Sequence, residues 1–279
     1  MASNQDMRFG TSPGVGMQEA VKRAIHVMRT RYSEKLSLQD LASEALFSPF
    51  HFARMFRVET GIPPGRYLTA VRMFEAKRLL LTTALNVSDI VASVGYSSVG
   101  TFTTRFTRMV GVSPAQYRTP EVRDLLAAVS PDFQCLPRFE VARVAKELRQ
   151  PVPGATGDIV GTIAAPPAAA PANVLIGVFN TIIPQCGPAA CQVLTGVESS
   201  EFVIRRVPVG KWVIIAMGQR AECMSAPNSM FVGGFGQLVT VGPGRVARVD
   251  IRLRSPRLTD PPIAIAVASP RSLATLGVR

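Results

Sequence analysis

The chain reads through one structural unit twice between residues 38 and 118, and this duplication limits what it can fold into. The first copy is LQDLASEALFSPFHFARMFRVETGIPPGRY, and the second is VSDIVASVGYSSVGTFTTRFTRMVGVSPAQY. Matched residues lie 50 positions apart, or 49 upstream of the turn: Phe52 with Phe102, Phe56 with Phe106, Gly61 with Gly111, Pro64 with Pro114, Tyr67 with Tyr117, then Ser37 with Asn86, Asp40 with Asp89 and Leu41 with Ile90. Duplicated helix-turn-helix units tolerate a one-residue difference in the turn, so we predict two tandem helical units.

The first unit carries start and stop signals for two helices. Ser37 with Asp40 three residues on caps one helix, and Ser48 followed by Pro49 begins the next. That next helix has an apolar side and an opposite side with arginines: the first is Phe52, Met55 and Phe56, and the second is Phe50, Ala53, Arg54 and Arg57. Gly61 then supplies the turn that ends the helix.

The second unit repeats this pattern with a less basic outer face. Asn86 with Asp89 caps its first helix, and Ser98 starts its second. The 50-residue offset places Gly100, Thr103, Thr104 and Thr107 on the outer face, with Arg105 and Arg108 flanking it within reach of phosphates. We also expect an initial helix over residues 18–32 and a linker helix over residues 64–83 that joins the two units.

A short helix with one face in the core and arginines on the other is built like a helix that reads DNA. The simpler interpretation is an ordinary helical bundle with core phenylalanines and solvated arginines. The duplicated caps, glycines and aromatic pairs favour the DNA-binding interpretation.

This half of the chain resembles the AraC/XylS family of bacterial transcriptional regulators. The segments that carry the resemblance are LASEALFSPFHFARMFRVETG, YLTAVRMFEAKRLLL and IVASVGYSSVGTFTTRFTRMVGVSPAQYR, within residues 18–118. The resemblance implies seven helices and two recognition helices that enter successive major-groove segments. Carried over by position, the base-reading residues are Phe50, Ala53 and Arg54 in the first groove, and Val99, Gly100, Thr103 and Thr104 in the second.

Two departures weaken base reading by this chain. Ala53 and Gly100 cannot donate hydrogen bonds from a side chain, and the second outer face has no Arg or Gln. We therefore expect the first helix to contribute more specificity, with Arg54 pairing to a guanine edge. The second helix is expected to offer thymine-methyl contacts and phosphate anchoring.

Charge supports a polyanionic partner but does not single out the repeat. The net charge is +12, with a pI near 10.4. Residues 1–118 hold 15 Lys and Arg against 8 Asp and Glu, a net of +7, and residues 119–279 hold 16 against 11, a net of +5. No apolar run approaches the ~20 residues of a membrane helix. Residues 1–16 are polar, and we expect a disordered tail and a cytoplasmic protein.

The second half is rich in Val and Ile runs separated by Pro and Gly. We expect a connector over residues 119–154 and an antiparallel β-sandwich over 155–279 that loosely resembles transthyretin-like and carboxypeptidase-regulatory-like domains. The expected strands are 158–164, 174–179, 192–194, 201–207, 211–217, 238–241, 245–253 and 263–267. WVIIAM is apolar on both faces, so its extra face packs on the connector, on the helical domain or on a second copy. We hypothesise self-association.

We find no catalytic or metal-binding set. The only histidines, His26 and His51, lie in the helical half. Cys186 and Cys191 have a C-x₄-C spacing that is not that of a zinc finger or ribbon, and Cys135 and Cys223 stand alone. Ordinary thiols are the favoured interpretation, with a redox-sensing pair and a metal site as alternatives.

The predicted protein therefore has a helix-turn-helix domain over residues 17–118 and a β-sandwich domain, with no enzymatic activity and no cofactor. Its predicted function is sequence-specific binding of double-stranded DNA as a transcriptional regulator. A small-molecule effector or a homodimer contact is assigned to the β-domain. The alternative is a scaffold protein whose two domains dock on protein partners.

Overall fold

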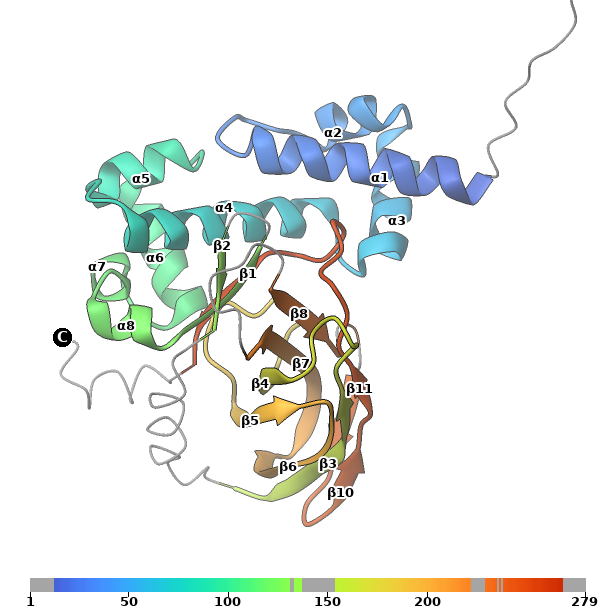
Figure 1. Cartoon of the computed structure of the whole chain (residues 1–279). Helices are drawn as coiled ribbons and strands as arrows, with labels where there is room; N and C mark the ends of the chain where they lie inside the picture. Colours follow the sequence, from blue (N-terminus) through green and yellow to red (C-terminus); the bar gives the residue numbers. More distant parts are fainter. Residues whose placement is uncertain are drawn as a thin grey trace, which may run out of the picture.

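The computed structural model describes residues 13–130, 133–136, 154–221, 229–234, 236 and 238–267. Its first part is helical and its second is built of strands, as the sequence predicts (Figure 1). The helices are α1 (Pro13–Thr30), α2 (Leu38–Ala45), α3 (Pro49–Thr60), α4 (Pro64–Thr82), α5 (Val87–Ser93), α6 (Val99–Val110), α7 (Pro114–Tyr117) and α8 (Pro120–Asp124). None of the helices in these ranges combines the length and apolar character of a bilayer-spanning segment.

The strands are β1 (Leu126–Ser130), β2 (Phe133–Cys135), β3 (Thr156–Ala164), β4 (Ala172–Phe179), β5 (Ala190–Val197), β6 (Ser199–Pro208), β7 (Gly210–Arg220), β8 (Met230–Gly233), β9 (Leu238–Val241), β10 (Val246–Arg248), β11 (Ile251–Arg252) and β12 (Ile263–Ala266). They form three sheets. The first has the order β12-β1-β2, the second joins β10, β3, β11 and β6, and the third joins β5, β4, β7, β8 and β9.

Several details differ from the expectations. Helix α1 begins at Pro13, so the end of the expected tail is helical, and residues 1–12 lie outside the described residues. Strands β1 and β2 fall within the expected connector, and β8 was not predicted. The pairing is mostly antiparallel, but β10 and β11 run parallel to β3. Both strands therefore run opposite to β6, which is antiparallel to β3.

The three sheets and the helices stack in layers, with the sheet β12-β1-β2 between α4 and the third sheet (Figure 1). One face of β1, with Leu126 and Ala128, joins the core of the second helical unit. The other face, with Ala127 and Val129, packs on the third sheet. The second and third sheets enclose the sandwich core.

The strand that contains WVIIAM is therefore covered on both faces within one chain. Ile214 and Ala216 of β7 point into the sandwich core, and Val213, Ile215 and Met217 pack toward the sheet β12-β1-β2. Of the three surfaces expected to cover it, the extra face packs on strands of the expected connector. The observation that prompted the self-association hypothesis thus has an explanation within the chain.

The two helical units have matching aromatic cores. The rings of Phe52 and Phe56 lie 5.6 Å apart, as do those of Phe102 and Phe106. Phe56 meets Tyr67 edge-on at 84°, and Phe106 meets Tyr117 at the same angle. Edge-to-face pairs of this kind favour one relative placement of the helices in each unit.

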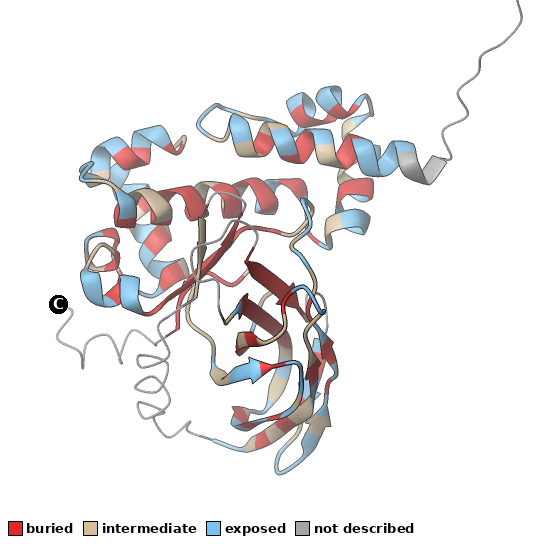
Figure 2. Ribbon diagram, viewed as in Figure 1, coloured by how far each residue is buried: buried red, intermediate tan, exposed pale blue. Residues whose placement is uncertain are grey.

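Helix α4 packs against both helical units and against the sheet β12-β1-β2, and it is buried along most of its length (Figure 2). Its first half packs with the first unit, through Tyr67, Leu68 and Val71. Its second half packs with the second unit and with the sheet β12-β1-β2. Almost no continuous face of α4 is left to solvent. A helix that is apolar nearly all round needs to be covered on several sides, here by both helical units and by the sheet β12-β1-β2.

Lys77 is a buried cation in this helix and ties it to the β-domain. Its side chain is 0% exposed, and Nζ donates to the main-chain oxygen of Gln185 at 2.9 Å and to Gln185 Oε1 at 3.0 Å. A third bond reaches the main-chain oxygen of Ala264 at 2.7 Å. Nζ also lies 5.8 Å from the centre of the Tyr117 ring. Burial lowers the pKa of Lys77 from 10.5 to about 7.

This lowered pKa predicts a pH-dependent stability. Between about pH 7 and 10.5 the unfolded chain holds a proton on Lys77 that the folded chain releases, so raising the pH stabilises the fold. Lys77→Met removes this contribution. We expect the free energy of unfolding of the native protein to rise relative to Lys77→Met by up to about 1.4 kcal/mol per pH unit above pH 7. Urea denaturation of both proteins at several pH values measures this difference. Parallel pH profiles would contradict the assignment.

Candidate nucleic-acid interface

Helix α3 presents the predicted outer face to solvent. Ser48 caps the helix by accepting a hydrogen bond from the His51 amide at 3.4 Å, and Gly61 ends it with a φ of 77°. Phe52, Met55 and Phe56 are buried. On the other side, Phe50 is 83% exposed, Arg54 and Arg57 are exposed, and Ala53 is half-buried.

Helix α6 has the same construction at the second site. Ser98 caps it through the Thr101 amide at 3.2 Å, and Gly111 ends it with a φ of 92°. The residues predicted to face DNA lie on its accessible side: Val99, Gly100, Thr104 and Arg108 are exposed, and Thr103 and Arg105 are half-buried. Gly100 has open space where a side chain would stand.

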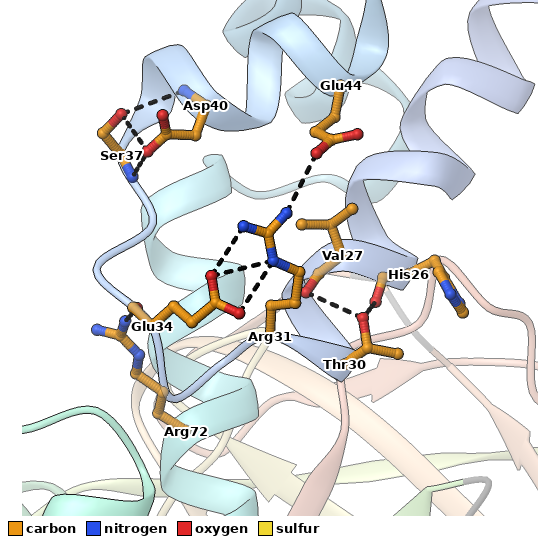
Figure 3. A network of polar contacts seen from close by, with 9 residues as sticks. All are labelled: His26, Val27, Thr30, Arg31, Glu34, Ser37, Asp40, Glu44 and Arg72. Atoms are coloured by element: carbon orange, nitrogen blue, oxygen red, sulfur yellow. Dashed lines mark hydrogen bonds and ion pairs between the residues drawn. The ribbon is translucent and has the colours of Figure 1, made fainter.

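A contact between the two units helps to fix the separation of α3 and α6. Arg72 of α4 donates from Nε to the main-chain oxygen of Tyr32 at 2.7 Å. Its Nη2 donates to the main-chain oxygen of Glu34 at 2.6 Å (Figure 3). Gly95, in the turn of the second unit, approaches the same loop so closely that a Cβ would lie 2.8 Å from the Ser33 main-chain oxygen. Its φ of 79° is also in the left-handed region. The turn after α1 and the turn before α6 are thus in direct backbone contact.

Acidic side chains near α1 form ion pairs and hydrogen bonds within the first unit. Figure 3 shows Arg31 between Glu34 and Glu44, with nitrogen–oxygen distances of 2.8 and 3.2 Å. Asp40 accepts from the Ser37 amide at 2.8 Å, and hydrogen bonds from Ser37 lower the pKa of Asp40. Ser37 and Asp40 form the predicted capping box of α2.

The arginines of the outer faces differ from Arg31, which is paired with two glutamates. Within the described residues, Arg54, Arg57 and Arg108 form no ion pair. Their guanidinium groups are therefore available to phosphates or guanine edges. His51 has a packing role, because its ring lies 5.1 Å from that of Phe47. Cys135, Cys186 and Cys191 are not joined in disulfides, and Cys223 lies outside the described residues.

Two residues that organise this region were not among the predicted site residues. Arg72 and Lys77 lie within the expected linker helix, where Arg72 fixes the contact between the units and Lys77 the contact with the β-domain. For Lys77 a signal was present, because it lies three residues after Phe74 and three before Leu80, on a stripe that is buried.

A helix-turn-helix domain family matches residues 41–120, which span α2 to α7. The transcriptional activator AarP of Providencia stuartii is 36% identical over 96 residues, covering 34% of this chain and 71% of that protein. The lactose operon transcription activator of Staphylococcus xylosus is 30% identical over 102 residues, which are 37% of each chain. This chain thus matches little more than a third of the staphylococcal protein.

Among solved structures, the C-terminal domain of the response regulator AraT from Geobacillus stearothermophilus is 38% identical. It covers 36% of this chain and 83% of that chain, with a TM-score of 0.34. The resemblance seen in the sequence is confirmed by the similarity to AarP over most of that protein's length. On the strength of that match, and of the paired helix-turn-helix units described above, the chain belongs to the AraC/XylS family of transcriptional regulators.

Proposed function

We propose that this protein regulates transcription by inserting α3 and α6 into two successive segments of the DNA major groove. The observation that carries the proposal is the repetition of an exposed outer face, 50 positions apart, on two helices held by α4. Phe50, Ala53 and Arg54 would read the first segment, with Arg57 beside them. Val99, Gly100, Thr103 and Thr104 would contact the second, with Arg105 and Arg108 on phosphates.

The different side chains on α3 and α6 suit the two helices to different contributions to DNA binding. Arg54 can form two parallel hydrogen bonds to a guanine edge, which discriminates bases by about 1–3 kcal/mol. The outer face of α6 offers methyl groups and hydroxyls instead, so it adds affinity and register more than base choice. In this proposal residues 17–118 read DNA, and the β-domain from 155 onward responds to a ligand. Self-association, a cytoplasmic location and the lack of enzymatic activity stay predictions.

The scaffold alternative makes a different prediction for salt. Neutralising phosphates releases counterions, so log affinity should fall with log salt by about 0.9 per phosphate contact. We expect the full chain to enrich a duplex site about two helical turns long from a random pool at ~150 mM salt, with that salt dependence. Sequencing of the bound fraction identifies the site. If no sequence is enriched, the regulator proposal fails and protein partners become the better explanation.

Arg54→Ala tests base reading by α3. Because the replaced side chain is exposed and unpaired, the fold should be unaffected while discrimination at one base position is lost. We expect the affinity for the selected site to fall by about 1–3 kcal/mol, with smaller losses on sites already altered at that position. Arg205→Ala, which removes an exposed arginine from β6, is the matched control. Equal losses on all sequences would assign Arg54 to a phosphate instead.

Gly95→Ala tests whether the contact between units sets the spacing of the two helices. The added Cβ cannot fit against the Ser33 main-chain oxygen, so the second unit must shift. We expect affinity for the complete site to fall by at least about tenfold, because two linked modules bind cooperatively only when both can engage. A site with one half scrambled should lose much less. Gly65→Ala, in α4 with open space around it, should leave both affinities unchanged.

A further inference from the structure

A cleft lies between the two helical units and one loop of the β-domain. Its volume is about 830 Å³, within the range of small-molecule sites. Helices α3, α4 and α6 provide one side, and the loop over residues 180–186, between β4 and β5, provides the other. In Figure 1 the β-rich part lies beneath α4, with the first unit at one end of this helix and the second unit at the other. We call this space the arginine cleft.

Four arginines line the arginine cleft, two from each side of the duplication. Arg57 and Arg66 come from α3 and α4, and Arg105 and Arg108 come from α6. The described lining contains no acidic side chain. None of the four forms an ion pair within the described parts of the chain. Four unpaired guanidinium groups around one space make a positive potential there, which attracts anions.

The remaining lining residues suit a small molecule with polar and apolar parts. Asn180, Thr181 and Gln185 add hydrogen-bonding groups, while Ile62 and Met109 add apolar surface. Guanidinium groups bind carboxylates and phosphates through paired hydrogen bonds, and two or more of them recognise a ligand with several anionic groups.

The loop of the β-domain is tied to the DNA-reading part of the chain. Ile182 and Ile183 pack against the core of the first unit. Gln185, in the cleft lining, holds the buried Lys77 of α4 through two oxygens. A ligand in the cleft would therefore touch both recognition helices and a loop anchored to the helix that joins them.

We propose that the arginine cleft binds a small polyanion, with carboxylate or phosphate groups, as the effector of this regulator. Arg57, Arg105 and Arg108 are also the side chains assigned to DNA, so the bound anion competes with phosphates for them and weakens DNA binding. The competition rests on the proposed function, whereas binding of the anion itself does not.

The first test measures anion binding to the full chain without DNA. Pyrophosphate and citrate are titrated by calorimetry at constant ionic strength, with acetate as a monovalent reference. We expect saturable binding of one pyrophosphate or citrate per chain, weakened at least about tenfold by Arg66→Gln, since a charge-assisted bond is lost. Asn180→Asp, which places a negative charge in the cleft, should weaken it similarly. Asn180→Ala removes a neutral hydrogen-bonding group without adding charge, so it should weaken binding less than Asn180→Asp. Arg205→Gln, the matched control outside the cleft, should change it less than twofold.

The second test separates an effector from a DNA phosphate in the same cleft. Affinity for the selected duplex is measured for the native protein and Arg66→Gln, with and without the anion. We expect equal affinities without the anion, and a loss on adding it that is smaller in Arg66→Gln. Lack of saturable binding, or binding insensitive to both cleft variants, overturns the proposal. A loss of DNA affinity in Arg66→Gln without any anion also overturns it, because Arg66 would then contact DNA phosphate rather than hold the anion.

Discussion

Burial of α4 from two directions holds the helical half and the β-rich half of the chain together. The helix joins the two helix-turn-helix units, and its remaining surface is covered by a sheet whose strands come from residues 126–135 and 263–266. Apolar packing forms most of the contact between α4 and this sheet, since Leu80 and Leu81 lie in one core with Leu126 and Ala264. Lys77 makes the contact specific, because its three hydrogen bonds can form only when the loop with Gln185 and the strand with Ala264 lie where they do.

This arrangement makes the β-domain part of the DNA reader's support. The sheet β12-β1-β2 faces the second helical unit on one side and the sandwich on the other. A second anchor holds the first unit, where the single hydroxyl hydrogen of Tyr67 is shared between the main-chain oxygens of Leu258 and Asp260, at oxygen–oxygen distances of 3.1 and 3.0 Å. Asp260 is itself held by Arg254, with nitrogen–oxygen distances of 2.7 and 2.8 Å. Both loops therefore contact α4 directly, and α4 is the helix that joins the two helix-turn-helix units.

Much of the helical domain could be predicted because its signals are local. Caps such as Ser37 and Ser98, and terminal glycines such as Gly61, act within a few residues of where they stand, and the structure confirms them. Most of the expected strands are present, and Val249, Ile251 and Leu253 alternate with exposed residues as predicted. The expected strand over residues 245–253 is divided into β10 and β11. Strands β1 and β2 were missed because β1 is buried on both faces and β2 is only three residues long, so neither shows the alternation that marks a strand.

The duplicated helical unit, the two outer faces and the family can all be predicted from the chain, since each rests on short-range spacing or on residues repeated 50 positions apart. How the two halves meet depends instead on contacts between distant segments. The partners of Lys77 lie 108 and 187 residues away along the chain, and the arginine cleft combines three helices with one distant loop. Contacts at such separations leave no periodic pattern in the sequence, because they depend on how complete elements pack once each has formed.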